Sequence, residues 1–94
     1  DYVLVSIGRA PLTEKIGIER TKIKLDRGFV VVNGFMQSDE QNIYAIGDCV
    51  NTPWLAHVAS KEGIIAAEHI AGKNPIPFNY DHTPSCVYSE PAVA

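Results

Sequence analysis

The sequence of 94 residues lacks several features that mark whole classes of protein. It has no apolar run near the roughly 20 residues of a membrane-spanning helix. Its 8 basic and 11 acidic residues give a formal net charge of −3. This balance argues against a nucleic acid or an anionic membrane as partner, because such ligands require clustered lysine and arginine. No G-x-G-x-x-G turn is present, so the sequence carries no fingerprint for a dinucleotide pyrophosphate.

Cysteine is also scarce. Cys49 and Cys86 are the only two, and they form neither a C-x-x-C pair nor a zinc-like spacing. Two thiols without a disulfide framework indicate a reducing compartment. We expect both to be ordinary buried thiols, because free cysteine behaves as a small hydrophobic residue. The histidines show no ligand spacing, and no metal site is predicted; His69 and His82 are interpreted as surface or loop residues.

Apolar residues, in contrast, make up 46% of the sequence, which fits a packed globular protein. Residues 2–7 (YVLVSI) form a near-continuous apolar run, which predicts a strand covered on both faces in a parallel sheet. Another strand-like run begins near Cys86 and reaches the last residue. Domains seldom begin and end inside apolar segments, so we expect a piece of a longer chain.

The middle of the sequence alternates strand and helix patterns. Residues 21–34 (TKIKLDRGFVVVNG) predict a hairpin with its turn at Asp26, Arg27 and Gly28. Residues 42–47 (NIYAIG) predict a buried strand. A helix over residues 54–71 follows, with Thr52 as its N-cap, Pro53 in its first position and Gly72 as its C-terminal stop.

The predicted helix has an apolar stripe of Leu55, Ala59, Ala66 and Ile70, broadened by Val58 and Ile65. Its alanines and Gly63 allow close approach to a sheet. The pattern as a whole therefore predicts an α/β fold.

Asp48 follows the strand at 42–47 directly and precedes the helix. Ligands of open α/β sheets bind at the carboxyl ends of strands, near helix N-termini. Asp48 is therefore a candidate ligand-binding carboxylate. The alternative is a structural aspartate that accepts hydrogen bonds from nearby backbone N–H groups of the turn.

Three segments occur in a recognisable order: DYVLVSIGRAP, NIYAIGDCV and WLAHVASKEGIIAAEHIAG. In this order and spacing the sequence resembles the flavin-dependent pyridine nucleotide-disulfide oxidoreductases over nearly its whole length. The A-x-G-D motif is widespread, whereas LAHVASKEG is far more specific. The sequence is most similar to the members that oxidise dihydrolipoamide, because glutathione and mercuric reductases normally carry other residues where LAHVASKEG stands.

The resemblance implies cofactor contacts for particular residues. Asp48 would accept a hydrogen bond from a ribityl hydroxyl of FAD. The helix start would direct backbone N–H groups at the N1 and C2-carbonyl edge of the flavin; its residues are Trp54, Leu55, Ala56 and His57. Gly8 would lie near the bound NAD, where a side chain would obstruct the cofactor.

Other positions depart from the family pattern or carry no clear role. Arg9 is as well explained by a solvated turn as by a cofactor contact. Trp54 stands where methionine is commoner. His57 is expected to contribute its backbone, with a packed ring, because the catalytic histidine of the family belongs to a segment that this sequence lacks. The C-x-x-x-x-C redox pair is also absent, so no catalytic residue is assigned here.

The resemblance also implies an organisation. The fold class is α/β, a fragment of a doubly wound FAD/NAD(P)-binding fold with a β-hairpin, a long helix and the start of the interface domain. Residues 1–11 would be the last strand of the NAD-binding domain. Residues 12–79 would complete the FAD-binding domain, and residues 80–94 would open the interface (dimerisation) domain.

The implied parent protein oxidises dihydrolipoamide to lipoamide through a redox disulfide and FAD, with NAD as acceptor, while the 94 residues alone are inactive. It would be a homodimer within 2-oxo acid dehydrogenase complexes, act on a dihydrolipoyl domain, and occupy the bacterial cytoplasm or the mitochondrial matrix. The alternatives are another disulfide reductase of the glutathione or mercuric reductase type, or a non-catalytic α/β interaction module.

Overall fold

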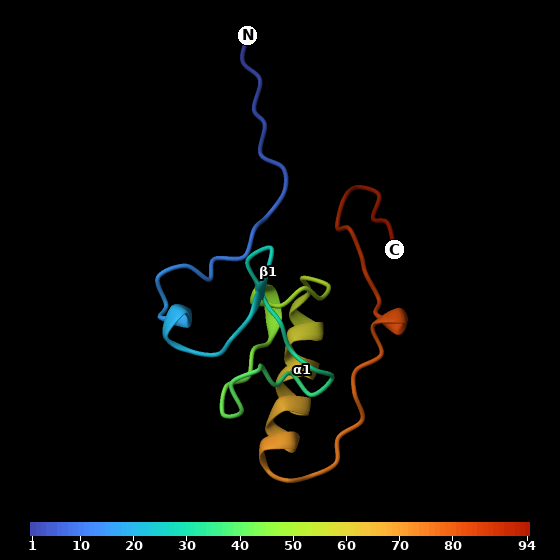
Figure 1. The fold of residues 1–94 in the computed structure, drawn as a ribbon. Helices are drawn as coiled ribbons and strands as arrows, with labels where there is room; N and C mark the ends of the chain where they lie inside the picture. The colour runs from blue at the N-terminus through green and yellow to red at the C-terminus, as the bar shows by residue number, and fades with distance from the viewer.

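The computed structural model describes residues 1–94. One long helix lies beside a short hairpin and its connecting loops, and an arm of chain extends from each end of this unit (Figure 1). We call residues 1–10 the amino-terminal arm and residues 84–94 the carboxyl-terminal arm. The radius of gyration is 16.1 Å, whereas a compact chain of this length has about 12 Å. The arms therefore give the molecule an extended outline.

The hairpin consists of strands β1 (Leu25–Asp26) and β2 (Phe29–Val30), which pair in antiparallel register with Leu25 opposite Val30. Arg27 and Gly28 form its two-residue turn, with φ angles of 50° and 87°. Two successive left-handed residues are typical of the type I′ turn, whose twist matches that of a hairpin. The predicted hairpin is confirmed, although Asp26 lies in the strand and not in the turn.

The helix α1 (Ala56–Ile70) starts later than predicted. Leu55 is its N-cap in an extended conformation without a side-chain cap, and the Leu55 N–H donates to the Pro53 carbonyl at 2.8 Å. This tight turn keeps residues 53–55 out of the helix, so the predicted start at Thr52 and Pro53 is wrong. The predicted end is confirmed, since Gly72 has a φ of 71° directly after the C-cap Ala71.

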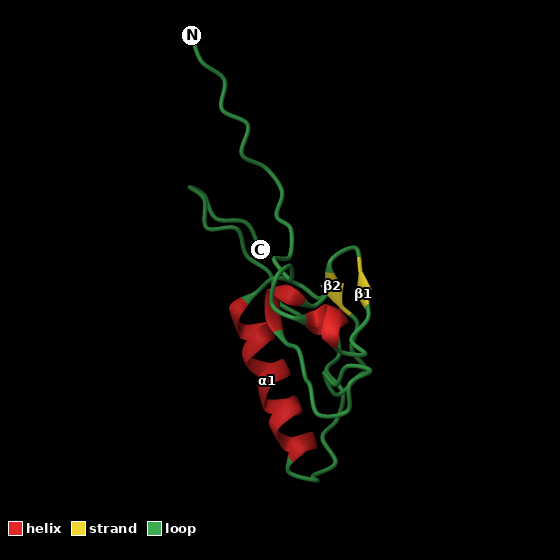
Figure 2. Ribbon diagram, turned by 60° about the vertical axis from the view of Figure 1, so that its left-hand side comes forward, coloured by secondary structure: helices red, strands yellow, loops and turns green.

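The core lies between α1 and the chain from β2 to residue 50 (Figure 2). Val30 forms an isolated parallel bridge with Val50, and Gln37 forms an antiparallel bridge with Tyr44. The buried apolar side chains are Val30, Met36, Val50, Val58, Ile65 and Ala66. Of the predicted helix stripe with its broadening residues, Val58, Ile65 and Ala66 are buried, whereas Ile70 is 65% exposed. The predicted apolar face of α1 is therefore confirmed at these three residues and wrong at Ile70.

Three predicted strands do not form. Residues 2–7 are extended but exposed and without strand partners, residues 42–47 contain only the bridge at Tyr44, and the carboxyl-terminal arm contains only a bridge between Val87 and Val93. A strand exists only when another strand supplies its hydrogen bonds. In this chain no second strand lies beside residues 2–7. The α/β character is kept by the hairpin and the helix.

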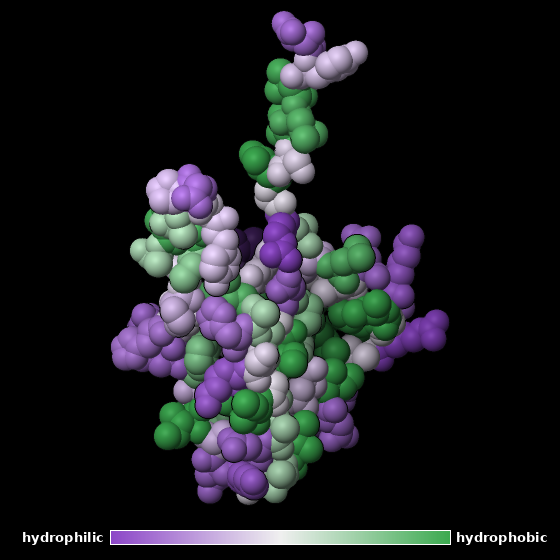
Figure 3. All heavy atoms as spheres, turned by 180° about the vertical axis from the view of Figure 1, so that it is seen from behind, coloured by the Kyte–Doolittle hydropathy of each residue, from purple (hydrophilic) through white to green (hydrophobic).

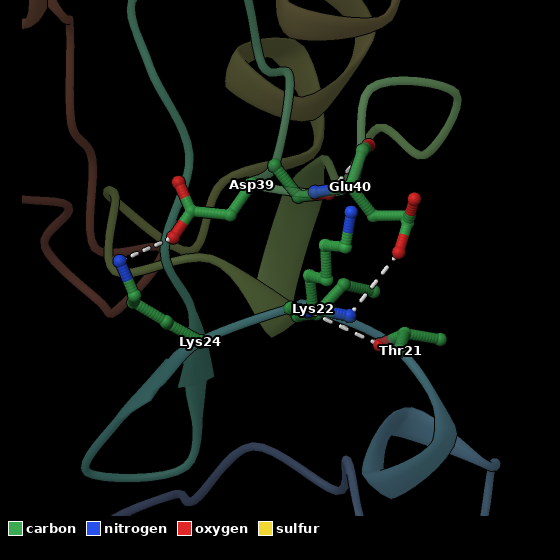
Figure 4. A network of polar contacts seen from close by, with 7 residues as sticks. Thr21, Lys22, Lys24, Asp39 and Glu40 are labelled. Atoms are coloured by element: carbon green, nitrogen blue, oxygen red, sulfur yellow. Dashed lines mark hydrogen bonds and ion pairs between the residues drawn. The ribbon is translucent and has the colours of Figure 1, made fainter.

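Polar contacts hold the segment before β1 to the loop at residues 38–40 (Figure 4). Lys24 Nζ lies 2.7 Å from Asp39 Oδ2, and the Lys22 N–H donates to Glu40 Oε2 at 3.2 Å. The hydrogen bond from Lys24 to Asp39, with the charge of that carboxylate, raises the pKa of Lys24. Because these groups are exposed, the contacts fix the loop direction and contribute little to stability.

The short helices complete the chain: η1 (Ile18–Arg20), η2 (Gly47–Cys49) and η3 (Tyr80–His82). No helix has both the length and the apolar character needed to cross a membrane.

Candidate functional site

The turn η2 is attached to α1 by a buried carboxylate. Glu62, in the middle of α1, is fully buried, and its Oε2 accepts a hydrogen bond of 2.7 Å from the Gly47 N–H. Gly47 has a φ of 72°, and a Cβ at this position would lie 3.4 Å from the Ala59 Cβ. The left-handed backbone conformation favours glycine here, and the neighbouring helix lies within van der Waals contact. The sequence A-I-G-D thus places η2 directly against α1.

A second hydrogen bond reaches the same carboxylate from η3. Tyr80 Oη donates to Glu62 Oε1 at 2.8 Å. Burial of the ring, followed by the hydrogen bond to Glu62 and its negative charge, raises the pKa of Tyr80. The phenol therefore remains protonated at neutral pH and acts as the donor. Three segments that are distant in the sequence meet at Glu62.

Asp48 lies on the open side of this turn. Its Oδ2 accepts a hydrogen bond of 2.5 Å from the Arg9 guanidinium, and the side chains of Arg9 and Asp48 are 63% and 53% exposed. The guanidinium carbon of Arg9 also lies 4.8 Å from the centre of the Trp54 ring. Phe29 continues the cluster, with its ring 5.7 Å from that of Trp54. Arg9 is therefore not a freely solvated arginine, and it lies beside two residues predicted to contact a cofactor.

The first turn of α1 presents unpaired backbone donors. Ala59 donates its N–H to the Leu55 carbonyl, so the intrahelical bonds begin there. The N–H groups of Ala56, His57 and Val58 precede it, and no side chain caps them. Such a helix start, with its partial positive charge, suits an electron-rich oxygen or nitrogen of a ligand.

His57 is exposed, and its Nε2 lies 3.1 Å from the Pro84 carbonyl. The predicted packing of its ring is wrong, because the side chain is exposed and its hydrogen-bond neighbour is the carboxyl-terminal arm, which lies beside the first turn of α1. A cavity of about 450 Å³ opens between them, lined by Leu55, Ala56, His57, Pro84, Cys86 and Tyr88. The arm thus borders the predicted cofactor-contacting helix start.

Thr52 adds an unpaired acceptor and donor close to the helix start. Its Oγ1 is inaccessible to solvent and has no hydrogen-bond partner. Native structures seldom leave such a group unpaired. The predicted capping role of Thr52 is therefore wrong, because its hydroxyl binds no backbone N–H of the helix start.

Gly8 has a φ of 80°, and nothing lies within 4 Å of the position that a Cβ would occupy. Its left-handed backbone is by itself a sufficient reason for glycine. The contact with NAD stays a prediction.

Glu62 and Tyr80 were not among the predicted site residues. A signal for Glu62 exists in the sequence, because it lies at the i+4 position between Val58 and Ala66 on one stripe of the helix. A carboxylate on an apolar stripe implies a buried acceptor with partners from elsewhere. For Tyr80 we find no such signal, since η3 lies in a proline-rich connection.

Three predictions about single side chains need correction or refinement. His69 is half-buried in α1, with Nδ1 2.8 Å from Tyr44 Oη and its ring stacked on Phe35 at 4.7 Å. Cys86 is exposed, and Cys49 is half-buried with its thiol directed at the Ile46 carbonyl. Long-range neighbours, absent from any local pattern, decide these environments. His82 is exposed, as predicted. No cluster of three or more His, Cys, Asp or Glu side chains could hold a metal ion.

Residues 1–63 match the model of a protein family described as pyridine nucleotide-disulphide oxidoreductase. The whole chain is also similar to named proteins. It is 51% identical over 94 residues to a dihydrolipoyl dehydrogenase of Bacillus subtilis, covering 100% of this chain and 20% of that protein. It is 48% identical over 95 residues to the mitochondrial dihydrolipoyl dehydrogenase of Canis lupus familiaris, covering 100% of this chain and 18% of that protein. The chain spans about one fifth of the length of these relatives.

The fold has a solved counterpart as well. The crystal structure of LpdA from Mycobacterium tuberculosis superimposes with a TM-score of 0.85 at 34% sequence identity, covering 93% of this chain and 19% of that one. The arrangement of hairpin, turn, helix and arms is therefore that of an α/β segment from an FAD/NAD-binding fold, as the sequence predicted.

Proposed function

The chain belongs to the pyridine nucleotide-disulphide oxidoreductases, and we propose that it is the cofactor-positioning segment of a longer dihydrolipoyl dehydrogenase. The observation that carries this proposal is the similarity to proteins of that name along the entire chain. The full-length protein oxidises the dithiol of dihydrolipoamide to the cyclic disulfide. Two electrons and one proton pass to NAD⁺ as a hydride, and the second proton is released.

FAD, when bound, relays the two electrons between the redox disulfide and the nicotinamide. The donors and acceptors of this chain fit such a ligand, which offers hydroxyl groups and a carbonyl edge. One carboxylate oxygen of Asp48 has no hydrogen bond within the chain. The first turn of α1 has unpaired N–H groups and no side-chain cap. These features support a polar ligand at this end of the helix.

Each predicted residue then has a defined task. Asp48 accepts a hydrogen bond from a ribityl hydroxyl, a charge-assisted contact of roughly 1.5–3 kcal/mol. The N–H groups at Ala56 and His57 bind the N1 and C2-carbonyl edge of the flavin. The dipole of α1 there stabilises negative charge on the ring. Trp54 and Leu55 shape the approach to this edge, and Gly8 leaves space for NAD.

The organisation of the full-length protein belongs to the same proposal. Residues 1–11 are the last strand of its NAD-binding domain, residues 12–79 complete its FAD-binding domain, and residues 80–94 begin its interface domain. The protein is a homodimer in a 2-oxo acid dehydrogenase complex, with a dihydrolipoyl domain as substrate. Its relatives include bacterial and mitochondrial proteins, and we assign it to a reducing compartment of that kind.

The assignment of Asp48 is tested by FAD titration of the full-length apo-protein. Asp48→Ala should raise the dissociation constant roughly tenfold to a hundredfold, through loss of about 1.4–3 kcal/mol. Asp48→Asn should raise it less, because the amide oxygen still accepts a hydrogen bond without charge assistance. The control is Asp81→Ala, since Asp81 is exposed and its carboxylate makes no hydrogen bond or ion pair.

A further control separates FAD binding from the ion pair between Arg9 and Asp48. If Asp48 served only that ion pair, Arg9→Ala would raise the dissociation constant as much as Asp48→Ala. An unchanged affinity in both Asp48 variants, with a lower melting temperature of the apo-protein, would make Asp48 a structural turn residue.

A further inference from the structure

Glu62 is a fully buried carboxylate for which the binding residues above provide no role. None of the ion pairs in the chain includes it. Burying an unpaired charged group costs several kcal/mol unless hydrogen bonds replace its hydration. Two donors, Gly47 N–H and Tyr80 Oη, do so at 2.7 and 2.8 Å. An apolar residue would fill this core position without that cost, so the carboxylate needs another explanation.

The position of Gly47, one of the two donors, at the start of η2 explains the buried carboxylate. Gly47 directly precedes Asp48, and its N–H donates to Glu62 and not to a strand. Behind the turn, a Cβ on Gly63 would lie 3.3 Å from Ile46 Cδ1. The hydrogen bond and these close approaches fix the entry to η2 on α1. The distance from Asp48 to the first turn of α1 is thereby set within one rigid unit.

We propose that Glu62 is a positioning residue for the flavin site. It holds Asp48 in register with the unpaired N–H groups at the start of α1, two features that must meet one ligand at the same time. Tyr80 completes the carboxylate's hydrogen bonding from η3. This inference rests on the proposed function, because the register matters only if one ligand spans both features.

Glutamine is the informative replacement, because its amide can satisfy both neighbours. The amide oxygen accepts from the Gly47 N–H, while the amide nitrogen donates to Tyr80 Oη, whose hydroxyl can turn to accept. Glu62→Gln therefore keeps both contacts without the charge. Glu62→Ala loses both contacts and leaves the Gly47 N–H without its acceptor.

The experiment measures FAD affinity and apo-protein melting in parallel, with the full-length protein. Glu62→Ala should raise the dissociation constant for FAD about tenfold or more. This increase should exceed the part that follows from a larger unfolded fraction of the apo-protein, which the melting curve gives. Glu62→Gln should have a dissociation constant within about threefold of that of the unsubstituted protein. Glu68→Ala, on the same helix and without a side-chain hydrogen bond, is the matched control and should leave the affinity unchanged.

A lower melting temperature of Glu62→Ala with unaltered affinity for FAD would overturn the inference and make Glu62 purely structural. If Glu62→Ala does not fold, Glu62→Asp decides. It keeps the charge, but the side chain is one methylene too short to hold both donors at the observed distances. Its dissociation constant should rise severalfold, and an unaltered one would overturn the inference. Failure of the unsubstituted full-length protein to bind FAD would instead refute the proposed function.

Discussion

The central unit and the two arms treat apolar side chains in opposite ways. In the unit formed by the hairpin, η2 and α1, Val58 and Ile65 are 0% and 1% exposed. In the arms, Leu4 and Tyr88 are 89% and 93% exposed. Figure 3 shows apolar side chains standing free of the body along the amino-terminal arm. Both regions are apolar in sequence, so composition alone does not determine burial.

The difference lies in where the partner atoms are found. The central unit closes through contacts within the chain, and its buried carboxylate receives both of its donors from the chain itself. Residues 2–7 have no strand beside them and so no hydrogen-bond partners for an extended backbone. In the proposed full-length protein these residues belong to the sheet of another domain. Thus the central unit buries its apolar side chains through contacts within the 94 residues, whereas the apolar side chains of the arms have no such contacts.

The largest loss of unfolding free energy should follow a substitution in the core of the central unit. Ile65→Ala is expected to lower the unfolding free energy of the 94-residue chain by about 2–4 kcal/mol, through lost burial and the cavity left behind. Ile70→Ala is the matched control, because it makes the same change on the same helix at a 65% exposed position and should cost about 0.5 kcal/mol or less. Urea denaturation followed by Trp54 fluorescence measures both values. Equal losses of unfolding free energy would contradict the structure, in which Ile65 is buried and Ile70 is exposed.

A smaller effect should come from the hydrogen bond that joins η3 to the core. Tyr80→Phe removes one donor from Glu62 and should lower the unfolding free energy by about 1 kcal/mol at neutral pH. The raised pKa of Tyr80 has a definite sign. Its contribution is fully present below the ordinary tyrosine pKa of about 10 and is lost as the pH rises above it, because only the unfolded phenol then releases its proton.

The unfolding free energy of the unsubstituted chain should therefore fall more steeply above about pH 10 than that of Tyr80→Phe. Urea midpoints between neutral pH and the alkaline range measure this slope. Tyr88→Phe is the control, since Tyr88 lies exposed in the carboxyl-terminal arm, and its profile should match that of the unsubstituted chain. Identical slopes in all three proteins would mean that Tyr80 does not donate to Glu62.

Local chemistry explains which parts of the fold could be predicted. The hairpin turn follows from Arg27 and Gly28, and the helix end from Gly72; both depend on neighbouring residues alone. The strands at 2–7 and 42–47 depend on partners distant in the sequence, and those predictions failed. The start of α1 was missed because the bond from Leu55 to Pro53 competes with helix formation.

The same division applies to the candidate site. Asp48 and the residues from Trp54 to His57 lie in short motifs that the sequence displays. Glu62 and Arg9 acquire their roles only when the chain folds, through contacts 15 and 39 residues away in sequence. A glutamate within a helix is expected to be exposed to solvent, unless its helical neighbours at i−4 and i+4 are apolar, as they are for Glu62. The residues next to Arg9 in the sequence do not indicate that its guanidinium lies over the Trp54 ring.

The smallest effect on stability should follow a substitution in the arms, and it tests most directly whether the arms differ from the central unit. Val5 is 74% exposed, so Val5→Asp should leave the unfolding free energy of the 94-residue chain within about 0.5 kcal/mol. Its effect should appear in association instead, because an exposed apolar strand segment is a template for pairing between chains. We expect the unsubstituted chain to self-associate at micromolar concentration in sedimentation velocity, and Val5→Asp to shift it towards monomer. Ser6→Asp adds the same charge to the same arm without removing an apolar side chain, and it should shift the distribution less. If the unsubstituted chain sediments as a compact monomer, the arms find their partner surfaces within the chain, and the contrast with the central unit does not hold.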